Sequence, residues 1–124
     1  MDQMKINSLY VAVHNRERAK EFYSKVFNCN PFLENQTFVF FDVNGFTFGL
    51  FDYKNADEAK NMGKSVTMGN NCVPNIQVDN INALYERIRE IAEIVKPLMN
   101  GSSKHRVFYI KDTEGNLIEF YEEI

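Results

Sequence analysis

The sequence predicts an α+β fold made of two tandem βαβββ modules. Two observations support this prediction. A strand, a helix and three further strand-like runs follow one another in the same order twice along the chain. In addition, Val13 and Asn15 at the first strand-to-helix junction match Val78 and Asn80 at the second one. We therefore expect the two halves of the chain to fold in the same way.

The first module begins with a strand at residues 6–13, which are rich in β-branched and aromatic side chains. Asn15 is a candidate N-cap for a helix in "HNRERAKEFYSKVF", where apolar residues recur at helical spacing. The dipeptide Asn44-Gly45 lies between two strand-like runs and is a strong hairpin signal, because both residues accept positive φ angles. We expect the three strands after the helix at 32–34, 37–43 and 46–51.

The second module repeats this layout. Asn80 is expected to cap a helix whose apolar stripe extends to Ile91, and Glu114-Gly115 is expected to form the last turn. The expected strands are 73–78, 94–98, 105–110 and 116–123. Residues 53–71 are polar and contain two glycines, so we interpret them as a linker. The modules then cover about 5–52 and 72–124 of a single domain, 1–124.

Composition excludes several classes of function. With a net charge of -3 and a pI near 5.4, the chain lacks the clustered basic residues that a nucleic-acid surface needs. No apolar run is long enough to span a membrane, and we expect a cytoplasmic protein. Cys29 and Cys72 are isolated, so we expect two free thiols.

Two stretches carry a resemblance to a known family. "VAVHNRERAKEFYSKVF" is similar to the first strand and helix, and "VFYIKDTEGNLIEF" to the closing hairpin, of the glyoxalase, bleomycin-resistance protein and extradiol dioxygenase superfamily. This group is also called the vicinal oxygen chelate superfamily. The resemblance covers nearly the whole chain and implies a glyoxalase fold, in which the two modules form a curved mixed sheet around a cleft. It does not decide the function, because the superfamily includes enzymes and metal-free binding proteins.

The resemblance also implies where metal ligands would lie. In metal-using members each module supplies one ligand from its first strand and one from its last strand. These positions fall on Ser8, Gly49, Val73 and Glu119. Only Glu119 is a good donor for a divalent first-row metal, so we expect neither a metal nor another cofactor. His14 and His105 are expected at the surface and not as ligands.

Strand alternation selects the candidate binding residues. Side chains that share a face with the four family positions include Tyr10, Phe51, Asn75, Gln77 and Tyr121. We expect this face to bind a ligand, with Glu119 as its polar anchor. Glu119 would meet a cationic or hydrogen-bond-donating ligand, or accept a hydrogen bond from Tyr10, Asn75 or Gln77. In the structural alternative, the aromatic residues only line a core and the two amides only face solvent.

Three functions remain open at this stage. The first is metal-free binding of a small aromatic or cationic molecule in the cleft, as bleomycin-resistance-like proteins do. The second is a glyoxalase-type lyase or isomerase, or a dioxygenase-related enzyme, with Glu119 as general base or metal ligand. The third is a domain used for protein contact. The resemblance and the exposed sheet edges together predict a homodimer.

Overall fold

The computed structural model describes residues 3–52, 72–102 and 104–123, without the side chains of residues 101 and 102. The chain divides into two compact units, Met1–Met68 and Gly69–Ile124. Each unit is a βαβββ module with its own mixed four-stranded sheet, which confirms the predicted α+β class. The predicted linker at 53–71 lies outside the described residues.

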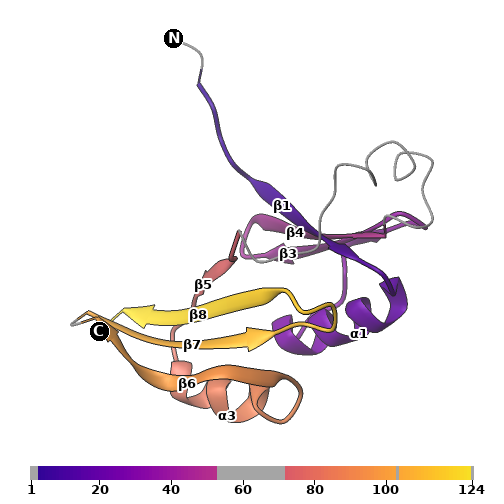
Figure 1. The fold of residues 1–124 in the computed structure, drawn as a ribbon. Helices are drawn as coiled ribbons and strands as arrows, with labels where there is room; N and C mark the ends of the chain where they lie inside the picture. The colour runs from indigo at the N-terminus through magenta and orange to yellow at the C-terminus, as the bar shows by residue number, and fades with distance from the viewer. Residues whose placement is uncertain (1–2, 53–71, 103, 124) are drawn as a thin grey trace. The chain divides into compact units, whose positions relative to one another are not determined.

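The first unit contains one helix and four strands. They are β1 (Ser8–Val13), α1 (Arg16–Phe27), β2 (Leu33–Glu34), β3 (Phe38–Val43) and β4 (Phe46–Asp52). The strand order across the sheet is β1-β4-β3-β2, as the upper part of Figure 1 shows for β1, β4 and β3. β1 runs parallel to β4, and the other pairs are antiparallel. The predicted strands therefore all form, with ends that shift by a residue or less in β2, β3 and β4.

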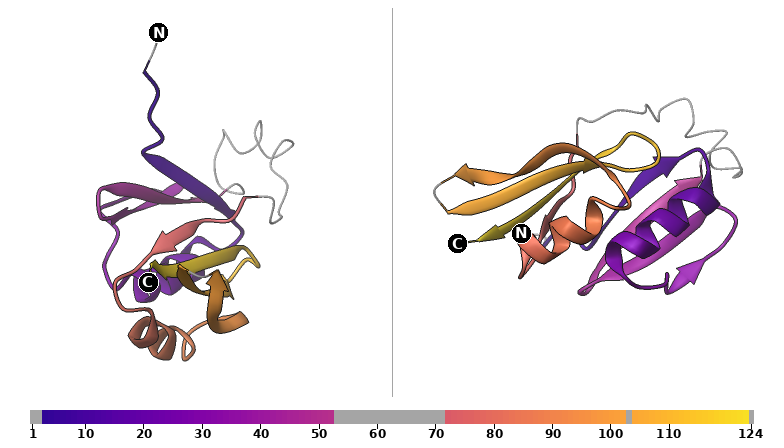
Figure 2. Two further views of the ribbon diagram at one scale, coloured as in Figure 1. Left: turned by 90° about the vertical axis from the view of Figure 1, so that its left-hand side faces the viewer. Right: turned by 90° about the horizontal axis from the view of Figure 1, so that it is seen from below.

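Helix α1 covers one face of the first sheet (Figure 2). It begins as predicted, because the Asn15 side chain accepts a hydrogen bond from the backbone N–H of Arg18. Tyr23 is fully buried and packs on Phe48 of β4, with the ring centroids 5.0 Å apart. The residues of β4 that point toward α1 therefore form the core of this unit, and the alternate residues form the opposite face.

The predicted hairpin at Asn44-Gly45 is confirmed. Both residues have positive φ angles, 51° and 90°, as a tight two-residue turn between antiparallel strands requires. The Asp42 carboxylate accepts a hydrogen bond from the Gly45 N–H at 2.7 Å. This turn sets the register of β3 against β4, so that Phe40 lies opposite Gly49.

The second unit has the same topology. Its elements are β5 (Asn75–Gln77), α3 (Ile81–Ile88), β6 (Glu93–Ser102), β7 (His105–Lys111) and β8 (Leu117–Glu123). The strand order is β5-β8-β7-β6, with β5 parallel to β8, and Figure 1 shows β8, β7 and β6 side by side in this order. Helix α3 packs on β7 and β8 through Tyr85, whose ring lies 5.0 Å from that of Phe108.

Three elements in this unit differ from the prediction by more than one residue. Helix α3 ends at Ile88 and not at Ile91, because the N–H groups of Ile91 and Ala92 both turn back to the Ile88 carbonyl. Strand β5 is shorter than predicted, and β6 is longer. β6 tolerates Pro97 because it is an edge strand with shifted register on either side of Lys96.

No helix in the described part of the chain is long and apolar enough to cross a membrane.

Candidate ligand-binding site

Glu119 lies at the centre of a row of polar side chains across the second sheet. Strand pairing places Asn75 of β5 on one side of it and Tyr109 of β7 on the other. Lys96 of β6 is paired with Tyr109 and extends the row to the edge of the sheet. The neighbours of Glu119 along β8, Ile118 and Phe120, are buried on the other face, which packs on α3. The carboxylate therefore lies on the face that the helix does not cover.

The Glu119 carboxylate is held by two neutral donors. The Asn75 side-chain amide donates a hydrogen bond to its Oε1 atom. The Tyr109 hydroxyl donates a second hydrogen bond, and this bond, with burial and the negative charge, raises the pKa of Tyr109 above its ordinary value near 10. Among the described residues no Lys, Arg or His forms an ion pair with Glu119. Its negative charge is therefore hydrogen-bonded, and no cation within the described ranges neutralises it.

A second polar pair lies next to this row. The Tyr121 hydroxyl donates to the Gln77 side-chain oxygen at 3.3 Å. The ring of His105, which is half-buried, meets the Tyr121 ring edge-on at 5.5 Å. Tyr121 and Glu119 are two residues apart on β8 and point to the same side. The structure thus brings Asn75, Gln77, Glu119 and Tyr121 together on one face of the second unit, as their spacing predicted.

Tyr10 and Phe51, the remaining predicted residues, lie together in the first unit. Their ring centroids are 5.5 Å apart. Tyr10 is 47% exposed and Phe51 is fully buried. The buried Phe51 ring therefore packs against the Tyr10 ring, and Tyr10 is the one of the two that is exposed to solvent.

Comparison with known families identifies the fold group. Residues 5–120 match the family described as the Glyoxalase/Bleomycin resistance protein/Dioxygenase superfamily. The chain belongs to this superfamily.

Solved structures of other members have the same fold. A glyoxalase/bleomycin resistance protein/dioxygenase family enzyme from Burkholderia phytofirmans PsJN superposes with a TM-score of 0.82 at 16% identity, over 98% of this chain and 100% of the other. A glyoxalase/bleomycin resistance protein/dioxygenase from Nocardioides gives a TM-score of 0.80 at 19% identity, over 100% and 86% of the two chains. A lactoylglutathione lyase from Agrobacterium tumefaciens gives 0.76 at 19% identity, over 98% and 95%. At these identities the likeness shows the fold of the superfamily and not a shared activity.

The metal site that the superfamily implies does not fit the side chains of this member. Gly49 and Val73 have no donor atom in their side chains, and Ser8 has only a hydroxyl. A Cβ atom at position 49 would lie 3.1 Å from two ring atoms of Phe40, so a ligand side chain there would also require this ring to shift by a few tenths of an ångström. Within the described ranges no group of three or more His, Cys, Asp or Glu side chains could hold a metal ion. His14 is exposed, as predicted.

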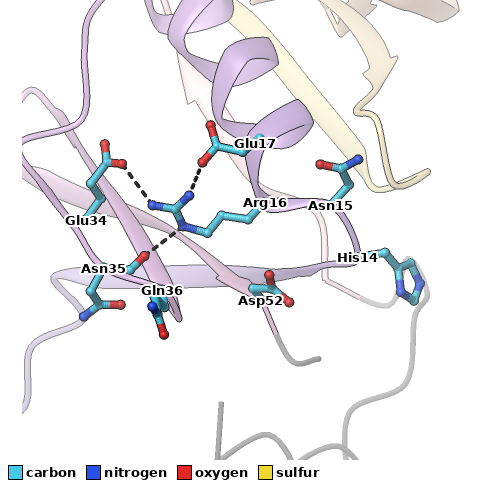
Figure 3. A pocket seen from close by; sticks show the side chains of 8 residues that line it. All are labelled: His14, Asn15, Arg16, Glu17, Glu34, Asn35, Gln36 and Asp52. Carbon is cyan, nitrogen blue, oxygen red and sulfur yellow. Dashed lines mark hydrogen bonds and ion pairs between the residues drawn. The ribbon is translucent and has the colours of Figure 1, made fainter. Parts of the chain in front are cut away.

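A depression of about 750 Å³ lies elsewhere on the first unit of this superfamily member (Figure 3). It is lined by His14, Asn15, Arg16, Glu17, Glu34, Asn35, Gln36 and Asp52. The Arg16 guanidinium crosses it and donates to the Asn35 carbonyl at 2.8 Å and to the Glu34 carboxylate at 2.9 Å. Lys20 also donates to Glu34 and, as the largest cause, lowers the pKa of that carboxyl. We interpret this network as a structural link between α1 and the end of β2 with the residue that follows it.

Sequence reasoning missed the hydrogen-bond donor Tyr109. Its place beside Glu119 depends on the register of β7 against β8, which the turn at Asp112–Asn116 sets. The Asp112 carboxylate accepts hydrogen bonds from the N–H groups of Glu114 and Asn116, both at 2.8 Å. Counting back from this turn on both strands would have placed Tyr109 opposite Glu119. The hairpin therefore indicated Tyr109 as a neighbour of Glu119, but only residues of β1 and β5 had been considered as its partners.

Proposed function

We propose that this superfamily member binds a small organic cation without a metal, and that the Glu119 carboxylate receives the positively charged group. The observation that supports the proposal is the environment of the Glu119 carboxylate. It is half-exposed, hydrogen-bonded to two neutral groups and not neutralised by a cation among the described residues. An ionised carboxylate can accept about four hydrogen bonds, so two positions remain for a ligand.

The aromatic residues around Glu119 support a cationic ligand. The Lys96 ammonium group lies 5.5 Å from the centre of the Tyr109 ring, so a positive charge is already stabilised on this face by an aromatic ring. Tyr121 provides a second ring on the same side. A ligand ammonium group could donate to Glu119 while its carbon atoms contact these rings. Tyr121 and Gln77 are hydrogen-bonded to each other and provide further polar contacts.

The donor set argues against the alternative of a metal-dependent lyase, isomerase or dioxygenase. Only one of the four family ligand positions offers a strong donor. Binding of a cation by Glu119 requires no metal, and we therefore favour binding over metal-dependent turnover.

The test is a calorimetric titration with benzylammonium, a cation with one aromatic ring, and with its neutral analogue benzyl alcohol. We expect Glu119→Gln to weaken benzylammonium binding about tenfold, because a charge-assisted hydrogen bond contributes roughly 1.5–3 kcal/mol. Glu90→Gln is the matched control, since it removes the same charge from an exposed position after α3. Benzyl alcohol should bind both variants equally.

Equal affinity of wild type and Glu119→Gln for benzylammonium would contradict the proposal. No binding of benzylammonium to the wild-type protein at millimolar concentration would also contradict it. Both variants must first be shown to unfold at the same temperature as the wild type, so that a loss of affinity is not a loss of folding.

A further inference from the structure

The turn between β3 and β4 contains a chemically reactive dipeptide. Asn44 and Gly45 join the two strands directly, and both are exposed to solvent. An asparagine that precedes glycine is prone to deamidation, because glycine has no side chain to shield its own nitrogen from the asparagine side chain. The cation site proposed at Glu119 does not use this turn.

Deamidation begins when the Gly45 nitrogen attacks Cγ of the Asn44 side chain. A new bond forms between these two atoms, the bond between Cγ and Nδ2 breaks, and ammonia leaves with the proton that the Gly45 nitrogen loses. Water then opens the resulting cyclic imide at either of its carbonyl groups. Residue 44 becomes aspartate or isoaspartate, and water is the only co-reactant.

The Asn44 side chain is not held in place. It forms no hydrogen bond within the part of the chain that the structure describes. Other turn asparagines differ in this respect. The Asn35 side chain accepts from the Thr37 N–H at 2.8 Å, and the Asn116 amide donates to the Asp112 carboxylate at 2.9 Å. The side-chain carbon of Asn44 can therefore move toward the nitrogen of the next residue.

The Gly45 nitrogen, in contrast, is held away from Asn44. Asn44 has a φ of 51°, in the left-handed region. In that region the Cβ atom and the next nitrogen lie on opposite sides of the Cα–C bond, so ring closure requires the peptide between them to rotate by roughly half a turn.

The Asp42 carboxylate opposes this rotation. It accepts a hydrogen bond from the Gly45 N–H at 2.7 Å, and its backbone is fixed in β3 opposite Thr47 of β4. Rotating the peptide before Gly45 turns the N–H away from the carboxylate and breaks the bond. A charged acceptor makes this bond stronger than one between neutral groups, although solvent weakens it at an exposed position. The rotation that deamidation requires is therefore disfavoured.

We infer that Asn44 is a deamidation site and that the Asp42 carboxylate slows the reaction by holding the Gly45 N–H. The modification would matter for the hairpin, because isoaspartate adds a carbon atom to the main chain. A two-residue turn lengthened in this way no longer fits the pairing of Val43 with Phe46.

The test compares the wild type, Asp42→Ala and Asp42→Asn during incubation at neutral pH, below their unfolding temperatures. Peptide mapping by mass spectrometry measures deamidation at residue 44, and labelling with an isoaspartyl methyltransferase measures isoaspartate. We expect Asn44 to react several-fold faster in Asp42→Ala. Asp42→Asn should remain closer to the wild type, because its amide oxygen can still accept the Gly45 N–H.

The chain provides an internal control in Asn100-Gly101, the same dipeptide in the second unit. Its deamidation rate should be the same in all three proteins. The inference is wrong if Asn44 reacts no faster in Asp42→Ala, or if Asp42→Asn reacts as fast as Asp42→Ala. It is also wrong if both dipeptides accelerate by the same factor, because the substitution would then act through general unfolding.

A measurement on the wild type keeps the test valid even if Asp42→Ala fails to fold. The Gly45 amide-proton resonance should move when acid protonates the Asp42 carboxylate, since that carboxylate is its acceptor. A Gly45 resonance that does not follow this protonation would overturn the inference.

Discussion

At the scale of single residues, the carboxylate in the middle of β8 is explained by its two donors. An isolated buried charge would cost several kcal/mol, and Glu119 avoids this cost by being half-exposed and hydrogen-bonded to Asn75 and Tyr109. The sequence predicted Asn75 as a partner correctly. Gln77, a second predicted partner, accepts from Tyr121 instead. Tyr10, the third, packs against rings of its own unit.

The hydrogen bond between Tyr109 and Glu119 predicts that Tyr109 loses its proton at a higher pH than an ordinary tyrosine does. Because the folded-state pKa of Tyr109 is raised, the bond stabilises the fold below pH about 10 and this contribution is lost as the pH rises through the folded-state pKa. Carbon-13 NMR of the tyrosine Cζ atoms should show one resonance that titrates above pH 10 and is absent in Tyr109→Phe. In Glu119→Gln the same resonance should titrate at a lower pH. An unchanged Tyr109 pKa in Glu119→Gln would show that the bond does not form.

At the scale of elements, capping and turn residues predicted the ends of helices and strands better than the spacing of apolar residues did. Asn15 and Asn80 cap their helices as predicted, and Asn44-Gly45 forms the predicted turn, because each signal acts through one local hydrogen bond or one backbone angle. The end of α3 and the length of β6 were not predictable in this way. They depend on a turn at Ile88 and on pairing with a distant strand, neither of which an apolar pattern specifies.

The cap of α3 can be tested directly. The Asn80 side chain accepts a hydrogen bond from the Ala83 N–H at 3.2 Å. Asn80→Ala should lower the free energy of unfolding by about 1 kcal/mol, because it leaves a helix N–H without this partner. Asn80→Ser, which keeps a capping oxygen, should retain most of the stability. Urea unfolding of the three proteins measures the difference, and equal stability of Asn80→Ala and the wild type would contradict the role of the cap.

At the scale of the whole molecule, the repeated module predicted the fold, and the family match over residues 5–120 is consistent with it. The candidate site was predictable in part. Strand alternation placed Asn75, Gln77, Glu119 and Tyr121 on one face, because alternation is a property of each strand alone. Tyr109 and Lys96 were missed because their places beside Glu119 follow from the register between strands. The predicted homodimer remains a prediction.

The most direct test of the account is whether the cation site works without a metal. Metal-stripped protein should bind benzylammonium with the same affinity in the presence of EDTA as after addition of equimolar Zn²⁺, because Glu119 acts as an anchor and not as a metal ligand. Isothermal titration calorimetry of both samples, with Glu119→Gln measured beside them, gives the answer. Equal affinities in the two wild-type samples and weaker binding in the variant would agree with the account. Binding that appears only after Zn²⁺ is added, with the bound metal lost in Glu119→Gln, would contradict it.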